Sequence, residues 1–197
     1  SIIESTKSAL RLLGLTKVEN LPEFVDYEGW INDVEKSVTL DAEWNPDNPS
    51  EIVSIQIKEY GKEPEVIYGK KDGQAIDADT ITDVLQRLEN FQNKGYKVVL
   101  FNGLNSDLLY MGRVTGQTNL AARVSMRAID LMLIAGEQTT VFPKLDNLAK
   151  AYGSRRKSTE ASGETVYADL NSGDASRIAN AKKYANEYYE TNKTVQR

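Results

Sequence analysis

Two carboxylates stand one residue apart at the end of a β-branched run, in the stretch SVTLDAEWNP at positions 37–46. In an extended chain, residues i and i+2 point to the same face, so Asp41 and Glu43 would lie side by side. Carboxylates placed in this way repel one another unless a cation lies between them. The pair therefore indicates a cation-binding site, although alone it could also be a solvated pair at a strand end.

The residue types that are absent narrow the chemistry further. The sequence contains no Cys and no His. This excludes a disulfide, a thiolate nucleophile, a Ser-His-Asp triad and a structural zinc site of the Cys/His kind. Carboxylates remain, and because they are hard oxygen ligands, a bound metal would be Mg²⁺ or Mn²⁺.

Further polar groups stand where other elements begin or continue. Asn102 and Asp107 follow an apolar run in VVLFNGLNSDLLYM, and the last predicted helix carries Tyr184, Glu187, Tyr188 and Glu190. Strand ends in an open α/β sheet are where ligands commonly bind. Taken singly, Asp107 could instead complement a helix dipole, and Asn102 could be a turn residue in its Asn-Gly pair.

Strands must position the first of these residues. β-branched and alternating stretches predict strands at 37–44, 51–60 and 64–69, joined as an antiparallel meander. The second would place Ile52, Ser54, Gln56 and Lys58 on one face. The nearly continuous apolar run at 96–102 fits a central strand that is covered on both faces.

Helices are predicted around these strands. The segment 77–95 would be capped by Asp79 or Thr80 and closed by Gly95, and a final helix would be capped by Asp174 or Ser176. Residues 154–173 are polar and contain Gly and Ser, which indicates a loop. Further helical patterns stand at 2–13, 106–114 and 144–153. The segment 24–36 fits a strand end followed by a helix, and 125–136 fits a strand or a helix around Asp130. The order β-β-β-α-β-α-α-α predicts an α/β domain with a mixed sheet.

Composition sets the broad class. The 197 residues, of which 40% are hydrophobic and 27% charged, suit one soluble globular domain with a short helical preface. No apolar run reaches membrane-spanning length and the start does not resemble a secretion signal, so we expect a cytoplasmic protein without a membrane partner. A net charge of −5 gives no general basic surface for nucleic acid, although GSRRKS at 153–158 is locally basic.

The motifs together resemble a known family. LDAEW, VSIQI, FNGLNSD and YANEYYET, in this order, are similar to the DnaQ-like (DEDD) 3'-5' exonucleases of the ribonuclease H-like fold. The Asn-to-Asp spacing in NGLNSD is similar to that of the proofreading domains of family B DNA polymerases. The resemblance covers about residues 24–195, which implies an exonuclease domain at 24–197 behind an N-terminal helical segment at 1–23. It implies a mixed sheet, an antiparallel meander followed by parallel strands, flanked by helices.

The resemblance also implies roles for individual residues. Asp41, Glu43 and Asp107 match carboxylates that hold two divalent cations, Mg²⁺ or Mn²⁺. In the third motif the family has Tyr-x-x-x-Asp. Tyr184 matches the tyrosine, which would position the nucleophile. Tyr188 stands where the family has the aspartate. The nearest carboxylate is Glu187, which could replace the aspartate as a metal ligand or leave the second metal site crippled.

Other positions would contact substrate or support the site. Asn102 matches the polar residue that precedes the second-motif aspartate, and Trp44 could stack on a base or fill the core. Asp130 stands where many family members carry a structural acidic residue, and the basic run 155–157 could guide a strand by its phosphates.

Three functions fit this pattern. The first is a metal-dependent 3'-5' exonuclease that releases mononucleotides from the 3' end of a single strand, with DNA favoured over RNA and a polymerase domain as a partner. The second is a degenerate relative that serves as a nucleic-acid-binding or structural module. The third is an unrelated carboxylate hydrolase or nucleotidase.

Overall fold

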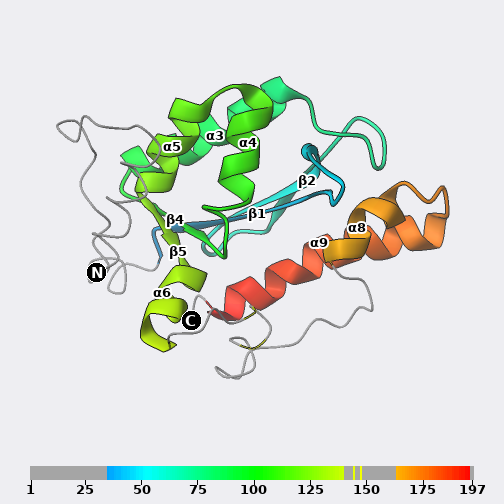
Figure 1. The fold of residues 1–197 in the computed structure, drawn as a ribbon. Coiled ribbons are helices and arrows are strands. Elements are labelled where there is room, and N and C mark those ends of the chain that lie inside the picture. Colours follow the sequence, from blue (N-terminus) through cyan, green and yellow to red (C-terminus); the bar gives the residue numbers. More distant parts are fainter. Residues whose placement is uncertain (1–34, 140–143, 145–146, 148–162, 196–197) are drawn as a thin grey trace.

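A mixed five-stranded sheet forms the centre of the protein. The computed structural model describes residues 35–139, 144, 147 and 163–195. The strand order is β3-β2-β1-β4-β5 (Figure 1). The strands are β1 (Ser37–Asn45), β2 (Asn48–Glu59), β3 (Glu65–Tyr68), β4 (Lys97–Leu100) and β5 (Ala128–Asp130).

The pairing confirms the predicted fold class. β2 pairs antiparallel with both β1 and β3, whereas β4 lies parallel to both β1 and β5. This is an α/β fold with a mixed sheet flanked by helices, of the ribonuclease H-like type. The predicted helices at 2–13 and 24–36, the basic run 153–158 and most of the helix at 144–153 lie outside the described residues.

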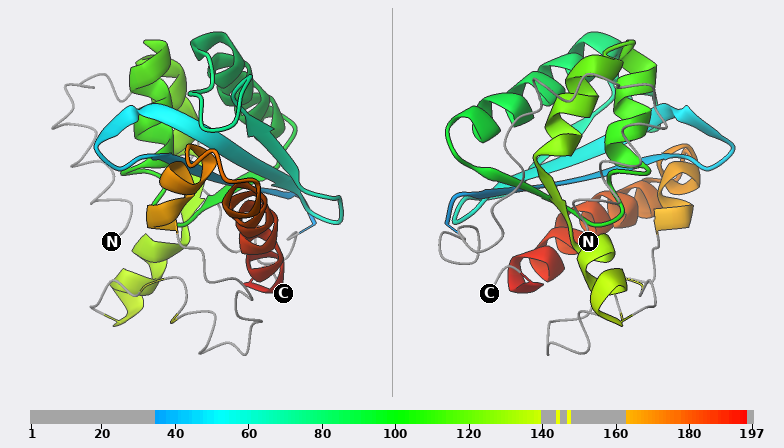
Figure 2. Two further views of the ribbon diagram at one scale, coloured as in Figure 1. Left: turned by 90° about the vertical axis from the view of Figure 1, so that its right-hand side faces the viewer. Right: turned by 60° about the vertical axis from the view of Figure 1, so that its left-hand side comes forward.

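Helices cover both faces of the sheet. α3, α4 and α5 lie over one face, and α8 and α9 lie over the other (Figures 1 and 2). The helices that the structure describes are α3 (Ala78–Asn93), α4 (Asp107–Thr115), α5 (Thr118–Met126), α6 (Leu131–Thr139), α8 (Gly163–Leu170) and α9 (Ala175–Val195).

Each face has its own hydrophobic core. The larger core joins apolar residues of β1, β2 and β4 to α3, α4 and α5, and includes Leu40, Ile55, Leu85 and Leu108. The smaller core joins β2 to α8 and α9 through Val53, Val166, Leu170, Ala181 and Tyr184. The two cores fix the helices independently on the two sides of one sheet.

β2 contains a β-bulge at Val53, where the strand changes which of its residues face each core. Glu43 pairs with Ser54, whereas the next residue, Trp44, pairs with Ile52, so the register skips Val53. Such an extra residue inverts the alternation of side chains along the strand.

The bulge corrects one prediction. Ile52 and Ile55 both belong to the larger core, although they are three residues apart, and Val53 belongs to the smaller one. The predicted common face of Ile52 with the polar residues of 54–58 is therefore wrong for Ile52, because the alternation changes phase at Val53.

The boundaries of α3 are partly as predicted. Its N-cap is Asp77, whose Oδ1 accepts the backbone N–H of Thr80 at 2.9 Å, so the predicted caps Asp79 and Thr80 are wrong. The helix begins at Ala78, and its first turn therefore needs an acceptor two residues earlier than Asp79. Gly95 closes the helix as predicted, with φ at 86°.

The sequence did not separate the segment after α4 into its elements. α5 packs so closely on α4 that Gly112 has no room for a side chain: a Cβ there would lie only 2.7 Å from the Cβ of Ala121. The segment predicted as strand or helix around Asp130 contains both, since β5 ends at Asp130 and α6 follows directly.

The predicted loop at 154–173 is partly helical. Residues 163–170 form α8, whose Val166 and Leu170 are buried against Val53 and α9. Their spacing of four places both on one face of the short helix, so tertiary packing overrides the polar composition.

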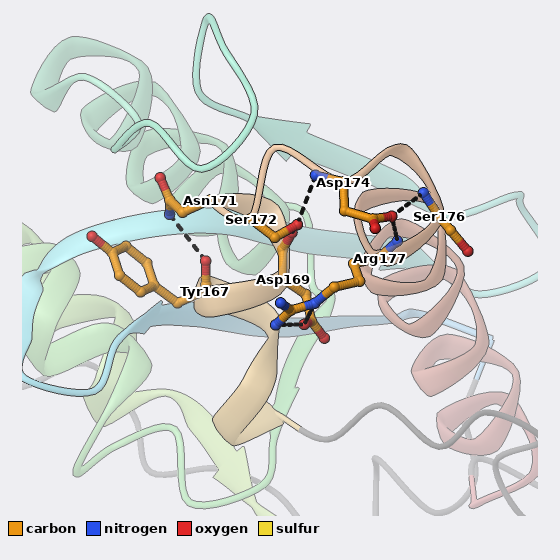
Figure 3. A network of polar contacts seen from close by, with 7 residues as sticks. All are labelled: Tyr167, Asp169, Asn171, Ser172, Asp174, Ser176 and Arg177. Carbon is orange, nitrogen blue, oxygen red and sulfur yellow. Dashed lines mark hydrogen bonds and ion pairs between the residues drawn. The ribbon is translucent and has the colours of Figure 1, made fainter.

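A hydrogen-bonded turn fixes α9 relative to α8 (Figure 3). Asp174 Oδ1 accepts the backbone N–H of Ser176 at 2.8 Å and that of Arg177 at 3.0 Å, which confirms Asp174 as the predicted cap. These bonds hold the pKa of the Asp174 carboxyl below its usual range. Arg177 also bonds Asp169 of α8 at 2.7 Å. The turn therefore sets the direction in which α9 leaves α8.

Candidate functional site

The first two carboxylates share a face of the sheet, as the alternation predicts. Asp41 pairs with Gln56 and Glu43 with Ser54, on the side of β1 and β2 over which α8 and α9 lie. The alternate residues of β1 belong to the larger core on the opposite face: Val38, Leu40 and Ala42.

Asp107 reaches this strand from α4. β1 pairs with β4 only at 37–39, so the edge of β1 that faces β4 is open beyond Thr39. There the backbone N–H of Ala42 donates to Asp107 Oδ1 at 2.7 Å, across 65 residues of chain. The structure thus attaches the second-motif carboxylate to the residue between Asp41 and Glu43.

Ser106 completes the setting of Asp107. Its hydroxyl lies 2.8 Å from Asp107 Oδ2 and 2.8 Å from the carbonyl oxygen of Asn102, so its single proton can be donated to either. When Asp107 is protonated, its own O–H can donate to Ser106, which then donates to Asn102. Sequence reasoning missed Ser106, and its position directly before the motif carboxylate was the one available signal.

Burial raises the pKa of the Asp107 carboxyl to about 6. The charge of Asp130 acts in the same direction, whereas hydrogen bonds from Ser106 and from the amide of Ala42 oppose the shift. A cation close to Asp107 would stabilise its ionised form and lower the pKa again.

Asp130 has the structural role that the resemblance implies. Its Oδ1 accepts the backbone N–H of Asn102 at 2.8 Å and that of Met132 at 3.1 Å, and its Oδ2 accepts that of Leu104 at 3.2 Å. Asn102 adopts a left-handed backbone with φ at 60°, which asparagine tolerates better than most residues. Asp130 therefore shapes the loop that leads from β4 to Asp107.

α9 brings Tyr184 over the face that carries the first two carboxylates. Tyr184 is 3% exposed and packs in the smaller core with Val53, which precedes Ser54, the partner of Glu43. Glu187 follows within the same helix, but its side chain lies outside the described residues, as do those of Tyr188 and Glu190.

Trp44 lies beside the site and belongs to the larger core. Its ring meets that of Tyr110 of α4 edge to face, with centroids 4.9 Å apart and planes at 72°. Packing of this kind fits the core role that the sequence left open, and stacking on a base stays a prediction.

The three described carboxylates of the predicted metal site lie near one strand end but do not form a metal-binding group by themselves. Within the described part of the chain, no three acidic side chains form a group that could hold a metal ion. The structure brings Asp41, Glu43 and Asp107 to one strand end and Tyr184 above it, and it does not test the predicted fourth ligand.

Comparison with known proteins supports the fold. A solved family B DNA polymerase from the hyperthermophilic archaeon Pyrobaculum calidifontis matches with a TM-score of 0.61 and 18% sequence identity. The chain shares its fold with part of that polymerase. The match covers 81% of this chain and 23% of the polymerase chain.

Sequence comparisons add nothing to this likeness. No protein-family model matches the chain, and no curated protein does so either. Among the described residues, no helix is long and apolar enough to cross a membrane.

Proposed function

We propose that the chain is a metal-dependent 3'-5' exonuclease that releases mononucleotides from the 3' end of a single strand, with DNA preferred to RNA. We further propose that it serves as the proofreading domain of a DNA polymerase. The bond between Asp107 Oδ1 and the amide of Ala42 is the observation that carries the proposal, because it joins the first and second motifs at one strand end.

The chemistry of the donor set fits divalent cations. Asp41, Glu43, Asp107 and Glu187 would hold two Mg²⁺ or Mn²⁺ ions, and carboxylate oxygens are the ligands that such ions prefer. The hydrogen bonds to Asp107 do not exclude this, because each carboxylate oxygen has a second lone pair. The bound ions would stabilise the attacking and leaving oxygens of an in-line phosphodiester displacement.

The remaining residues would hold and orient the substrate. Tyr184 would orient the attacking water over the carboxylate face, and Asn102 and Trp44 would contact the terminal nucleotide. The basic run 155–157 would guide the strand by its phosphates.

Digestion of 5'-labelled single strands of DNA and RNA in Mn²⁺ tests the proposal. We expect stepwise shortening from the 3' end that a 3' block prevents. The Asp41→Ala, Glu43→Ala double variant should be inactive, whereas Asp47→Ala, an exposed carboxylate in the following turn, should keep the parent rate. A double variant as active as the parent would reject the site, and a 3'-blocked strand cut equally fast would indicate an endonuclease.

One observation favours a second function, that of a nucleic-acid-binding module without turnover. Tyr188 stands in place of the third-motif carboxylate. For this alternative, the same strands should be retained in a gel-shift experiment but not shortened in Mn²⁺. Hydrolysis of free nucleotides without any action on strands would instead indicate a nucleotidase.

A further inference from the structure

A row of polar side chains is buried on β2. Ser54 is 0% exposed, Gln56 2% and Lys58 3%, all three on the face shared with Asp41 and Glu43. Burying polar groups costs free energy unless each finds a partner. A polar atom in this row that lacks a hydrogen-bond partner would therefore indicate a position suited to a ligand.

The side-chain oxygen of Gln56 has no hydrogen-bond partner. The amide nitrogen donates to the Ser54 hydroxyl at 3.4 Å, while Oε1 is buried and receives no donor. Leaving a buried acceptor without a donor costs free energy, so a ligand that places positive charge beside this oxygen would remove that cost.

The fold places this oxygen beside the two carboxylates. Gln56 lies directly opposite Asp41, where paired side chains on one face are nearest neighbours. Its bond to Ser54, the partner of Glu43, draws the amide towards the level of Glu43. The carboxamide thus lies along the same short stretch of the face as both carboxylates.

A second glutamine shows that an unpaired oxygen alone does not define such a site. Gln92 of α3 is 8% exposed and also has a buried Oε1 without a hydrogen-bond partner. Its amide nitrogen donates to the carbonyl oxygen of Val124 at 2.8 Å, which places it between α3 and α5. Of these two glutamines, only Gln56 lies opposite an acidic residue, Asp41, on a neighbouring strand.

A buried carbonyl oxygen that accepts no hydrogen bond and lies beside two carboxylates is suited to a cation. We propose that Oε1 of Gln56 is a neutral ligand of a divalent cation held by Asp41 and Glu43. Carbonyl and carboxylate oxygens together suit Mg²⁺ and Mn²⁺. The inference rests on the metal site of the proposed function, and it gives the cation an oxygen ligand from β2 that does not depend on position 188.

Mn²⁺ binding to the full chain can be measured without substrate by titration calorimetry or electron paramagnetic resonance, and this measurement tests the ligand. Gln56→Leu should weaken Mn²⁺ binding by at least about tenfold. Gln56→Glu should strengthen it, because it adds a negative charge at the same reach. The matched control, Gln92→Leu, should bind Mn²⁺ like the parent.

Three outcomes would overturn the inference. These are a parent that binds no Mn²⁺, a folded Gln56→Leu variant that binds like the parent, and a Gln56→Glu variant that binds more weakly. The last would mean that the amide is turned by 180° and donates from its nitrogen to Asp41. If Gln56→Leu fails to fold, Gln56→Glu alone still decides.

The two proposals can fail separately. Mn²⁺ binding that depends on Gln56 in a chain without nuclease activity would reject the exonuclease and keep the ligand. If the Gln56→Leu variant degrades strands with the same Mn²⁺ dependence as the parent, the ligand would be rejected and the exonuclease kept.

Discussion

The two faces of the β1–β2 pair are built from the same two strands and differ in almost every other respect. One face is apolar and packs against α3 and α4, and the other is polar except for Val53 and lies under α8 and α9. The apolar face includes Val38, Leu40, Ala42, Ile55 and Ile57; the polar face includes Thr39, Asp41, Glu43, Ser54, Gln56 and Lys58.

The apolar face contributes mainly to the stability of the fold, whereas the polar face carries the residues proposed for chemistry. The apolar face removes hydrocarbon from water, which stabilises the fold whatever the protein does. The polar face buries groups that would be cheaper to leave in water, and such departures from good packing are typical of functional sites. Because neighbouring residues on one strand belong to different faces, the contrast can be tested one position apart.

The largest effect should come from the adjacent residues Leu40 and Asp41. Asp41→Ala should lower Mn²⁺-dependent strand degradation by on the order of 10³-fold at little cost in stability, because it removes a metal ligand. Leu40→Ala should cost about 2–5 kcal/mol of unfolding free energy and keep activity below its melting temperature. Rates and urea unfolding of both variants check this, and an interchange of the two effects would contradict the division of the faces.

The third motif gives the next largest effect. If Glu187 is a ligand, Glu187→Gln should reduce the rate by on the order of 10²-fold, whereas Glu190→Gln, about 300° further round the helix, should matter less. Rates at saturating Mn²⁺ give the comparison. An unchanged rate in Glu187→Gln, together with a gain in Tyr188→Asp, would show that the polar face lacks its fourth carboxylate.

Asp107 predicts a smaller effect that depends on pH. Its pKa is raised from the usual range near 4 to about 6, so the folded state holds a proton that the unfolded state has lost between these values. The contribution of this group to stability is therefore largest below pH 4 and is lost as the pH rises to about 6.

Urea unfolding in EDTA at pH 4.5 and pH 7 checks the prediction. Asp107→Asn should remove a pH-dependent difference on the order of 1–3 kcal/mol, because the amide can still accept from Ala42 but does not titrate. A variant whose pH dependence equals that of the parent would show that burial does not shift this group.

The smallest effects should come from the helix caps. Asp77→Ala and Asp174→Ala each remove an acceptor for the first turn of a helix, and each should lower the melting temperature by about 2–4 °C. Only Asp174→Ala should also slow strand degradation, because α9 carries Tyr184 over the polar face. Equal rates in both variants would mean that the direction of α9 does not matter to the site.

Period and composition were sufficient for the main elements of the fold. The alternation in SVTLDAEW correctly placed Asp41 and Glu43 on one face, and the apolar run at 96–102 correctly indicated a central strand, which lies between β1 and β5. The short helix α5 was missed, and β5 was predicted only as part of one strand-or-helix segment with α6, because nine residues and three residues carry too little periodic signal to stand apart from their neighbours.

The site was predictable only where it is local. The structural role of Asp130 followed from the resemblance, but its three backbone partners did not, because they lie up to 28 residues away. Gln56 was correctly placed on a face with Ser54, yet its position opposite Asp41 depends on the register of the β1–β2 hairpin and on the bulge at Val53. The bond from Ala42 to Asp107 is a tertiary contact that no local pattern predicts.

The contacts of Asp130 also bear on the order in which the molecule is assembled during synthesis. The loop after β4 obtains its anchor from a residue made 26 to 28 positions later than the amides it holds. In a growing chain, β1, β2 and α3 can form before that anchor exists, whereas the loop that leads to Asp107 waits for β5. We therefore expect the amides of Asn102 and Leu104 to gain protection from hydrogen exchange together with β5 rather than with β4, which pulse labelling during refolding would measure.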